Sequence, residues 1–214
     1  MIQPLRSALA QEVARFQSWA EAYDDRRRGE WECDYPNWSD LYNAVAKYIS
    51  GSEVEEWDEG VTAMLLYAIA RDNEVEQIAG HLQADPDKLY ALAKEAVRSG
   101  EKDAKWQLAE QLTHWPDRLE ESESILLALA TDADEYVRRR ALMVLGRIKS
   151  SQVEMLVGEA WDTGDEYQRM AVLDALYNVQ SKKLASYLEL AQADGRQYLT
   201  AFANRIRRGE VLDR

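Results

Sequence analysis

The 214-residue sequence contains a single cysteine, Cys33, and this scarcity excludes two kinds of structure. One thiol cannot form an intramolecular disulfide, and a cysteine-based zinc site needs further ligands. The only histidines, His81 and His114, are far apart and lack the spacing of metal ligands. We therefore expect no metal and no cofactor. We interpret Cys33 as a structural or incidental thiol, because no histidine lies near it in the sequence to activate a nucleophile.

Proline and glycine are also scarce, with four and ten residues respectively. This scarcity favours long helices joined by short turns over many strands. The sequence has no apolar run that predicts a membrane span, and its N-terminal residues lack the apolar core of a signal peptide. It also has no phosphate-binding loop, dinucleotide fingerprint or zinc-protease helix. We expect a cytoplasmic protein that does not enter a membrane and is not an enzyme.

Acidic residues are abundant, with 39 Asp and Glu against 26 Lys and Arg. The excess is confined to the first part of the chain. Residues 1–135 hold 29 acids and 13 bases, whereas residues 136–214 hold 10 acids and 13 bases. Such a surface repels nucleic acid and attracts a basic protein surface. The alternative is an acidic surface that only keeps the protein in solution.

The segments 134–148 (DEYVRRRALMVLGRI) and 165–179 (DEYQRMAVLDALYNV) share residues at six equivalent positions, 31 positions apart. A repeat of roughly thirty to forty residues, with two helices in each unit, indicates an α-solenoid. Helical spacing of apolar residues predicts about five helical pairs. They are 61–71 with 74–82, 86–98 with 103–112, 122–131 with 134–148, 152–162 with 165–179, and 182–193 with 195–208.

The first sixty residues match no repeat unit. Apolar residues at helical spacing predict a helix over 5–28, which Arg26–Arg28 and Gly29 would end, and a second helix over 40–49. We interpret residues 1–60 as an N-terminal helical cap with acidic aromatic loops, and residues 61–214 as the repeat array.

The segment 132–148 resembles the second helix of a HEAT repeat, in which an acidic turn precedes a Val-Arg pair, and Ala and Leu follow at helical spacing. Here these residues are Asp134, Val137, Arg138, Ala141 and Leu145. The resemblance is clear over 120–180 and weaker over 61–82, 87–112 and 182–208. It implies an all-α solenoid of the small bacterial HEAT type, with about five pairs and an N-terminal cap.

In HEAT arrays the turn acid and the helix arginine commonly bond between neighbouring repeats. The resemblance therefore implies a structural ladder, rather than an active site, made by Asp134, Arg138, Asp165 and Arg169.

Aromatic and acidic residues concentrate in two connections, 30–39 and 51–60, and recur on the helix predicted over 103–112. Trp and Tyr are frequent interface anchors, and acids steer a basic partner. The candidate partner-binding residues are Trp31, Asp34, Tyr35, Trp38, Glu55, Glu56, Trp57, Trp106 and Glu110. The alternative is that these rings cap the exposed first helix pair of the solenoid.

The resemblance implies a non-catalytic protein-binding module that uses the concave face lined by second helices. Small acidic HEAT-like proteins of bacteria include scaffold and immunity proteins, so we expect a basic protein partner, with immunity or inhibition as the sharper form. Trp106, Glu110 and Trp161 also resemble the tryptophan-carboxylate sets of HEAT-like DNA glycosylases, although residues 61–135 lack the basic groove that DNA needs. A HEAT-like chromophore lyase and an assembly scaffold are also compatible with the resemblance.

Overall fold

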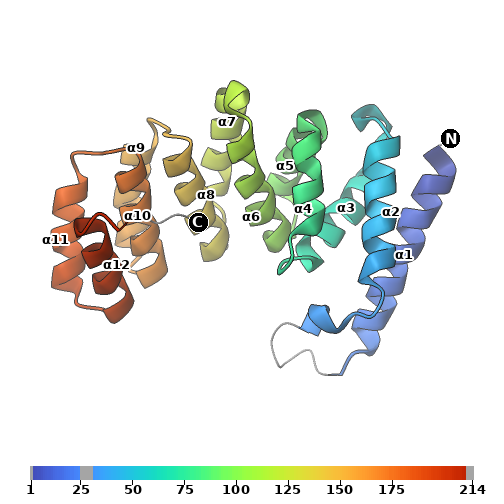
Figure 1. Cartoon of the computed structure of the whole chain (residues 1–214), viewed down its shortest axis with the longest axis horizontal. Helices are drawn as coiled ribbons and strands as arrows, with labels where there is room; N and C mark the ends of the chain where they lie inside the picture. The colour runs from blue at the N-terminus through green and yellow to red at the C-terminus, as the bar shows by residue number, and fades with distance from the viewer. Residues whose placement is uncertain (1, 25–30, 211–214) are drawn as a thin grey trace. The chain divides into compact units, whose positions relative to one another are not determined.

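The computed structural model describes residues 2–24 and 31–210, and within these ranges it contains α-helices and short 3₁₀ turns but no β-strand (Figure 1). The all-α class expected from the sequence is therefore confirmed. None of the described helices is both long enough and apolar enough to cross a membrane. The α-helices are α1 (Ile2–Ala22), α2 (Trp38–Gly51), α3 (Glu59–Arg71), α4 (Gln77–His81), α5 (Pro86–Arg98), α6 (Lys102–Gln111), α7 (Leu119–Leu129), α8 (Glu135–Arg147), α9 (Val153–Asp162), α10 (Glu166–Asn178), α11 (Leu184–Asp194) and α12 (Gln197–Arg207).

Aspartate caps explain where several helices begin. The carboxylates of Asp58, Asp85, Asp134 and Asp165 accept hydrogen bonds from backbone N–H groups in the first turns of α3, α5, α8 and α10. Each of these aspartates has an extended backbone, which is the usual conformation of an N-cap. The helices α8 and α10 therefore begin within one residue of the starts predicted from the repeat.

Two predicted helices differ from the structure in length. The helix predicted over 5–28 ends as α1 at Ala22, and its predicted end signals, Arg26–Arg28 and Gly29, lie outside the described residues. The segment predicted as one helix over 74–82 forms the short α4 and the 3₁₀ turn η3 (Leu82–Ala84). Glu76 has a φ of 55°, a left-handed conformation that prevents the helix from beginning earlier.

The chain forms two compact units, Met1–His114 and Trp115–Arg214. In the first unit α1 packs on α2 and α3, and α6 packs on α3 and α5. The first unit therefore begins with a helix pair of its own, α1 with α2. The predicted division into a cap at 1–60 and a repeat array at 61–214 depends on which segments repeat in the sequence, and it stays a prediction.

The second unit is built from three helix pairs. Each first helix, α7, α9 or α11, packs on the second helix that follows it, and α10 packs on both α8 and α12. The helices α8 and α10 approach closely, because a Cβ atom at Gly146 would lie 2.7 Å from Cα of Ala175. This contact belongs to the continuous apolar interior that stacked repeats require.

The turn after each of α8 and α10 repeats the same bonds. Ser150 and Ser181 follow residues with positive φ, and each accepts a hydrogen bond from the backbone N–H two residues later. Their hydroxyls donate to Glu123 of α7 and Glu154 of α9, respectively. These Ser–Glu bonds tie each second helix to the first helix of a pair, an arrangement that the sequence analysis does not predict.

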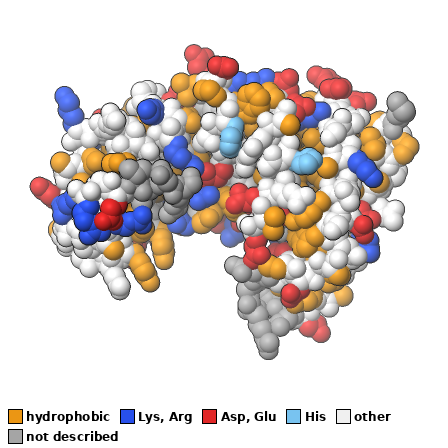
Figure 2. Space-filling view, in the orientation of Figure 1, with side chains coloured by type: hydrophobic (Ala, Val, Ile, Leu, Met, Phe, Trp, Pro, Cys, Tyr) orange, Lys and Arg blue, Asp and Glu red, His pale blue; other side chains and the backbone are white. Residues whose placement is uncertain are grey.

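The two units differ in charge. The first unit holds 22 acids and 12 bases, whereas the second holds 17 acids and 14 bases. Figure 2 shows carboxylates scattered over the first unit and a group of Lys and Arg side chains over the α11–α12 end of the second. The acidic excess that the sequence predicts for the chain is therefore mainly a property of the first unit.

Candidate protein-interaction surfaces

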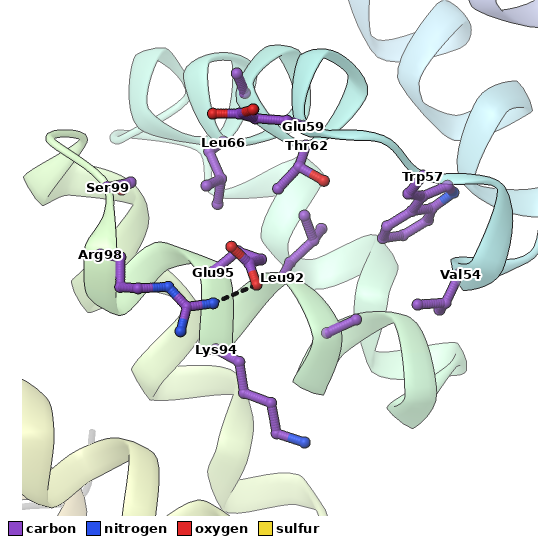
Figure 3. Close-up of a pocket in the computed structure, with 12 residues that line it drawn as sticks. Val54, Trp57, Glu59, Thr62, Leu66, Leu92, Lys94, Glu95, Arg98 and Ser99 are labelled. Atoms are coloured by element: carbon purple, nitrogen blue, oxygen red, sulfur yellow. Dashed lines mark hydrogen bonds and ion pairs between the residues drawn. The ribbon is translucent and has the colours of Figure 1, made fainter.

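An open groove of about 790 Å³ lies between α3 and α5 in the first unit. In Figure 3, Thr62 and Leu66 of α3 and Leu92 of α5 point into the space between the two helices. Trp57 stands at one end of the groove, and Arg98 stands at the other. An apolar floor of this size, with charged residues at its edges, can accept several side chains from one face of a partner helix.

An acidic connection leads into this groove. It contains the 3₁₀ turn η2 (Val54–Glu56) and Trp57, whose indole N–H donates to the Ser52 hydroxyl at 2.8 Å. The indole is thereby held in place while Trp57 keeps part of its surface in contact with solvent. Trp57 is flanked in the sequence by five exposed acids, which are Glu53, Glu55, Glu56, Asp58 and Glu59.

Part of this acidic connection also has a structural role. The Glu56 carboxylate accepts a hydrogen bond from the Glu53 N–H at 2.9 Å, in a reciprocal capping box. Asp58 accepts from the Val61 N–H at 3.0 Å and pairs with Arg6 at 2.7 Å. The Val61 hydrogen bond, followed by Arg6, lowers the pKa of Asp58 below its ordinary value. Three of the acids beside Trp57 therefore also order the backbone around it.

The tryptophans and the tyrosine of the connection 30–39 belong to an aromatic cluster at the end of α1. Tyr35 is only 3% exposed, and its ring centroid lies 4.5 Å from that of Phe16. Trp31 stacks on Trp19 with centroids 5.5 Å apart, and the half-buried Trp38 packs edge-on against Tyr35. The structure thus places Tyr35 inside, and the rings of Trp31 and Trp38 pack on neighbouring aromatic rings.

The remaining candidates lie apart from one another. Asp34 is exposed and accepts a hydrogen bond from the Tyr23 hydroxyl. Trp106 of α6 is 5% exposed, and its indole N–H donates to Asp103 at 3.1 Å. Glu110 is half-buried on the last turn of the same helix. Of the nine candidate residues, only Trp57 lines the groove, and Glu55 and Glu56 precede it in the acidic connection.

The predicted ladder residues make mainly local bonds at the α7–α8 turn. The Asp134 carboxylate caps α8 by accepting two backbone N–H groups at 2.9 and 3.3 Å. The Arg138 guanidinium donates to the carbonyl oxygens of Asp132 and Ala133 at 2.7 and 2.8 Å. The arginine therefore satisfies backbone acceptors in the turn that precedes its own helix.

Arg169, the equivalent arginine of the next pair, bonds residues of two other helices. Asp165 caps α10, while Arg169 donates to the Trp161 carbonyl at 2.9 Å and to the Asp194 carboxylate at the end of α11. Asp194 also binds the Arg196 guanidinium at 2.7 Å. These bonds, led by that of Arg196 and supported by Arg169, hold the pKa of Asp194 well below its ordinary value. The contact between neighbouring pairs thus joins Arg169 to Asp194.

The sequence carries no signal for the apolar floor of the groove. Leu66 and Leu92 follow the helical periodicity of ordinary core residues, and this pattern does not say which two helices stand apart. Only Trp57, at the end of the groove, has a sequence signal, namely an aromatic residue within a run of acids.

Comparison with known proteins finds a family match for part of this chain. Residues 122–203 match the family model of HEAT repeats, a segment that runs from α7 into α12. Residues 122–203 therefore resemble HEAT repeats, in agreement with the resemblance of residues 120–180. No curated protein and no solved structure shows significant similarity to it. HEAT repeats are generally protein-interaction modules.

Proposed function

We propose that this protein binds a basic protein partner at the α3–α5 groove of its first unit and does not act as a catalyst. The observation that carries this proposal is the juxtaposition of Trp57, an apolar groove of about 790 Å³ and a run of exposed carboxylates. Buried apolar contacts supply affinity at interfaces, while surrounding charges choose the partner and speed its approach.

The chemistry of the groove favours an amphipathic basic helix as the bound segment. Its apolar side chains would pack against Trp57, Ala63 and Ala91, which keep exposed surface in the groove. Its Lys or Arg side chains would face Glu59 and the exposed Glu55 that precedes Trp57 in the sequence. Lys94 and Arg98 lie along α5, and Arg98 is paired with Glu95 at 2.6 Å. We therefore place the basic face of the partner toward η2 rather than toward the end of α5.

The sharper form of this proposal is an immunity or inhibitor protein that neutralises a basic partner in the cytoplasm. The net acidic charge of the first unit supports it, because opposite charge accelerates capture of the partner. A neighbouring gene for a toxin-like protein would favour this form, whereas self-association would favour an assembly scaffold.

The two enzymatic functions, glycosylase and lyase, have less support. A glycosylase of the HEAT-like type would need Trp106 and a carboxylate at an open basic surface. Trp106 is 5% exposed and bonded to Asp103, and the unit that contains it is acidic. Binding of duplex DNA at moderate salt would favour a glycosylase function, and binding of a pigment would favour a lyase function.

A direct test uses the full chain and a labelled amphipathic helical peptide that carries Leu on one face and Lys on the other. We expect binding that weakens as salt is added. We expect Ala63→Arg, which fills the groove from α3, and Glu55→Lys, which reverses a charge near Trp57, each to weaken binding about tenfold. Ala185→Arg, at an exposed alanine of α11, is the matched control and should have no effect.

The same variants should be used to capture partners from a native lysate. The wild-type chain should retain a basic protein that Ala63→Arg loses and Ala185→Arg retains. Failure to recover any basic protein at several salt concentrations, together with equal peptide binding by all variants, would refute the proposed function.

A further inference from the structure

The second unit carries tyrosines at the same place in three successive pairs. Tyr136, Tyr167 and Tyr198 are each the second residue of a second helix, in α8, α10 and α12, and they are spaced by 31 positions. The structure describes six exposed large apolar side chains, and two of them are Tyr167, at 46%, and Tyr198, at 59%. Because Tyr167 and Tyr198 are exposed, packing in the core does not explain why a tyrosine recurs at this position of the repeat.

These rings form one continuous surface with two arginines. The Arg139 guanidinium carbon lies 4.6 Å from the Tyr136 ring centroid and 5.1 Å from that of Tyr167. The Arg140 guanidinium lies 5.7 Å from the Tyr136 ring, and Tyr167 stacks with Tyr198 at 6.4 Å. We name this set the Tyr–Arg stripe: it consists of Tyr136, Arg139, Arg140, Tyr167 and Tyr198.

The two glutamates beside the Tyr–Arg stripe are already engaged within the unit. Glu135 pairs with Arg139 Nε at 3.1 Å, and burial is the main cause that raises the pKa of its carboxyl group. Glu166 accepts the Leu199 N–H at 3.0 Å, at the start of α12. The Tyr–Arg stripe therefore presents mainly guanidinium and phenol groups, which are hydrogen-bond donors, on a surface of aromatic rings.

We propose that the Tyr–Arg stripe is a second docking surface, which binds an extended acidic segment of another protein. Tyr and Arg are enriched among the residues that dominate interface energies. Carboxylates are the acceptors that match guanidinium and phenol donors. The second unit also holds 17 acids and 14 bases, against 22 and 12 in the first, so an acidic segment meets less repulsion here than on the first unit.

The ring geometry disfavours single-stranded nucleic acid as the occupant. Recognition of unpaired bases uses free aromatic faces as stacking platforms. Here Tyr136 and Tyr167 stack with Arg139, and Tyr167 stacks with Tyr198. The phenol hydroxyls of the exposed Tyr167 and Tyr198 suit hydrogen bonds to carboxylates.

The test measures the affinity of the full chain for a fluorescein-labelled peptide in which Glu alternates with Leu. We expect Arg140→Gln and Tyr198→Ala each to weaken binding about tenfold. The matched controls are Lys182→Gln, an exposed cation in the turn before α11, and Leu190→Ala, an exposed leucine of α11. Both should bind the peptide like the wild type, and all four variants should keep the wild-type helical spectrum.

Three results would overturn the proposal. The first is equal affinity for a matched peptide with Gln in place of Glu. The second is tighter binding of a uridine oligonucleotide that depends on the same two residues. The third is self-association of the chain that Tyr198→Ala abolishes. The proposal is independent of the α3–α5 groove, so Ala63→Arg should leave affinity for the acidic peptide unchanged.

Discussion

At the residue scale, Arg138 shows how a repeated charge serves the backbone. Its guanidinium donates to two carbonyl oxygens of the α7–α8 turn and is half-buried. A hydrogen bond that involves a charged group contributes about 1.5–3 kcal/mol, and buried carbonyls without partners are costly. Its main contribution should therefore be to stability.

We expect Arg138→Ala to lower the free energy of unfolding by about 2 kcal/mol without changing the helical content. Chemical and thermal denaturation followed by circular dichroism would measure this loss. Lys182→Ala, at an exposed lysine, is the control and should change stability by less than about 0.5 kcal/mol. An unaltered melting temperature for Arg138→Ala would contradict a structural role for this arginine.

Asp194 should make the second unit sensitive to acid. Arg196 and then Arg169 lower the pKa of this carboxyl group in the folded protein below its ordinary value of 3.8. A group with a lowered folded pKa stabilises the fold above its unfolded pKa, and this contribution is lost as the pH falls toward the folded pKa. We expect stability to decline below about pH 4.

The variant Asp194→Asn isolates this effect. It should be less stable than the wild type at pH 7, and the difference should shrink as the pH is lowered below about 4. Urea unfolding of both proteins at each pH would measure it. A difference that is the same at pH 7 and pH 3 would rule out the proposed link to Asp194.

At the scale of helices, two glycines separate helix propensity from packing. Gly146 of α8 faces the α10 backbone, where an added Cβ would lie 2.7 Å from Cα of Ala175. Gly158 lies inside α9, and an added Cβ there would meet nothing within 4 Å. Alanine is more favourable than glycine in a helix interior by about 1 kcal/mol. If the two Gly→Ala variants change stability in opposite directions, the difference must come from packing around Gly146.

We expect Gly146→Ala to destabilise the protein by about 1–3 kcal/mol, because α8 and α10 must move apart. Gly158→Ala should stabilise it by about 0.5–1 kcal/mol. Both values follow from urea denaturation of the two variants beside the wild type. If Gly146→Ala proved as stable as Gly158→Ala, the close approach of α8 and α10 would be wrong.

The boundaries of most helices could be predicted, because the signals are local. Asp134 and Asp165 mark their helix starts through a side chain that bonds a backbone N–H in the next turn. Glu76 carries no such signal, yet its left-handed backbone shortens α4. In the same connection between α3 and α4, the buried Asp72 accepts the Ile78 N–H.

At the scale of the whole molecule, each unit buries its own core. Leu65 and Leu108 are fully buried in the first unit, as are Val144 and Leu176 in the second. In repeat proteins each layer is stabilised chiefly by its neighbours. A packing defect in one unit should therefore loosen that unit first.

We expect Gly146→Ala to accelerate amide hydrogen exchange in α8 and α10 while α3 and α6 keep their wild-type protection. Hydrogen–deuterium exchange with mass spectrometry resolves these helices, and Gly158→Ala should accelerate neither set. Equal acceleration in both units would show that the chain opens as one cooperative body.

The sequence by itself determined most of the helices, the pairing of those in the second unit and the acidic excess of the first part of the chain, because periodicity, caps and charge are properties of neighbouring residues. Only the tertiary structure decided which aromatic rings remain available. Tyr35 and Trp106 are buried, whereas Trp57 is left beside a groove. The Tyr–Arg stripe likewise depends on stacking, because its tyrosines become one surface when successive second helices bring them into contact.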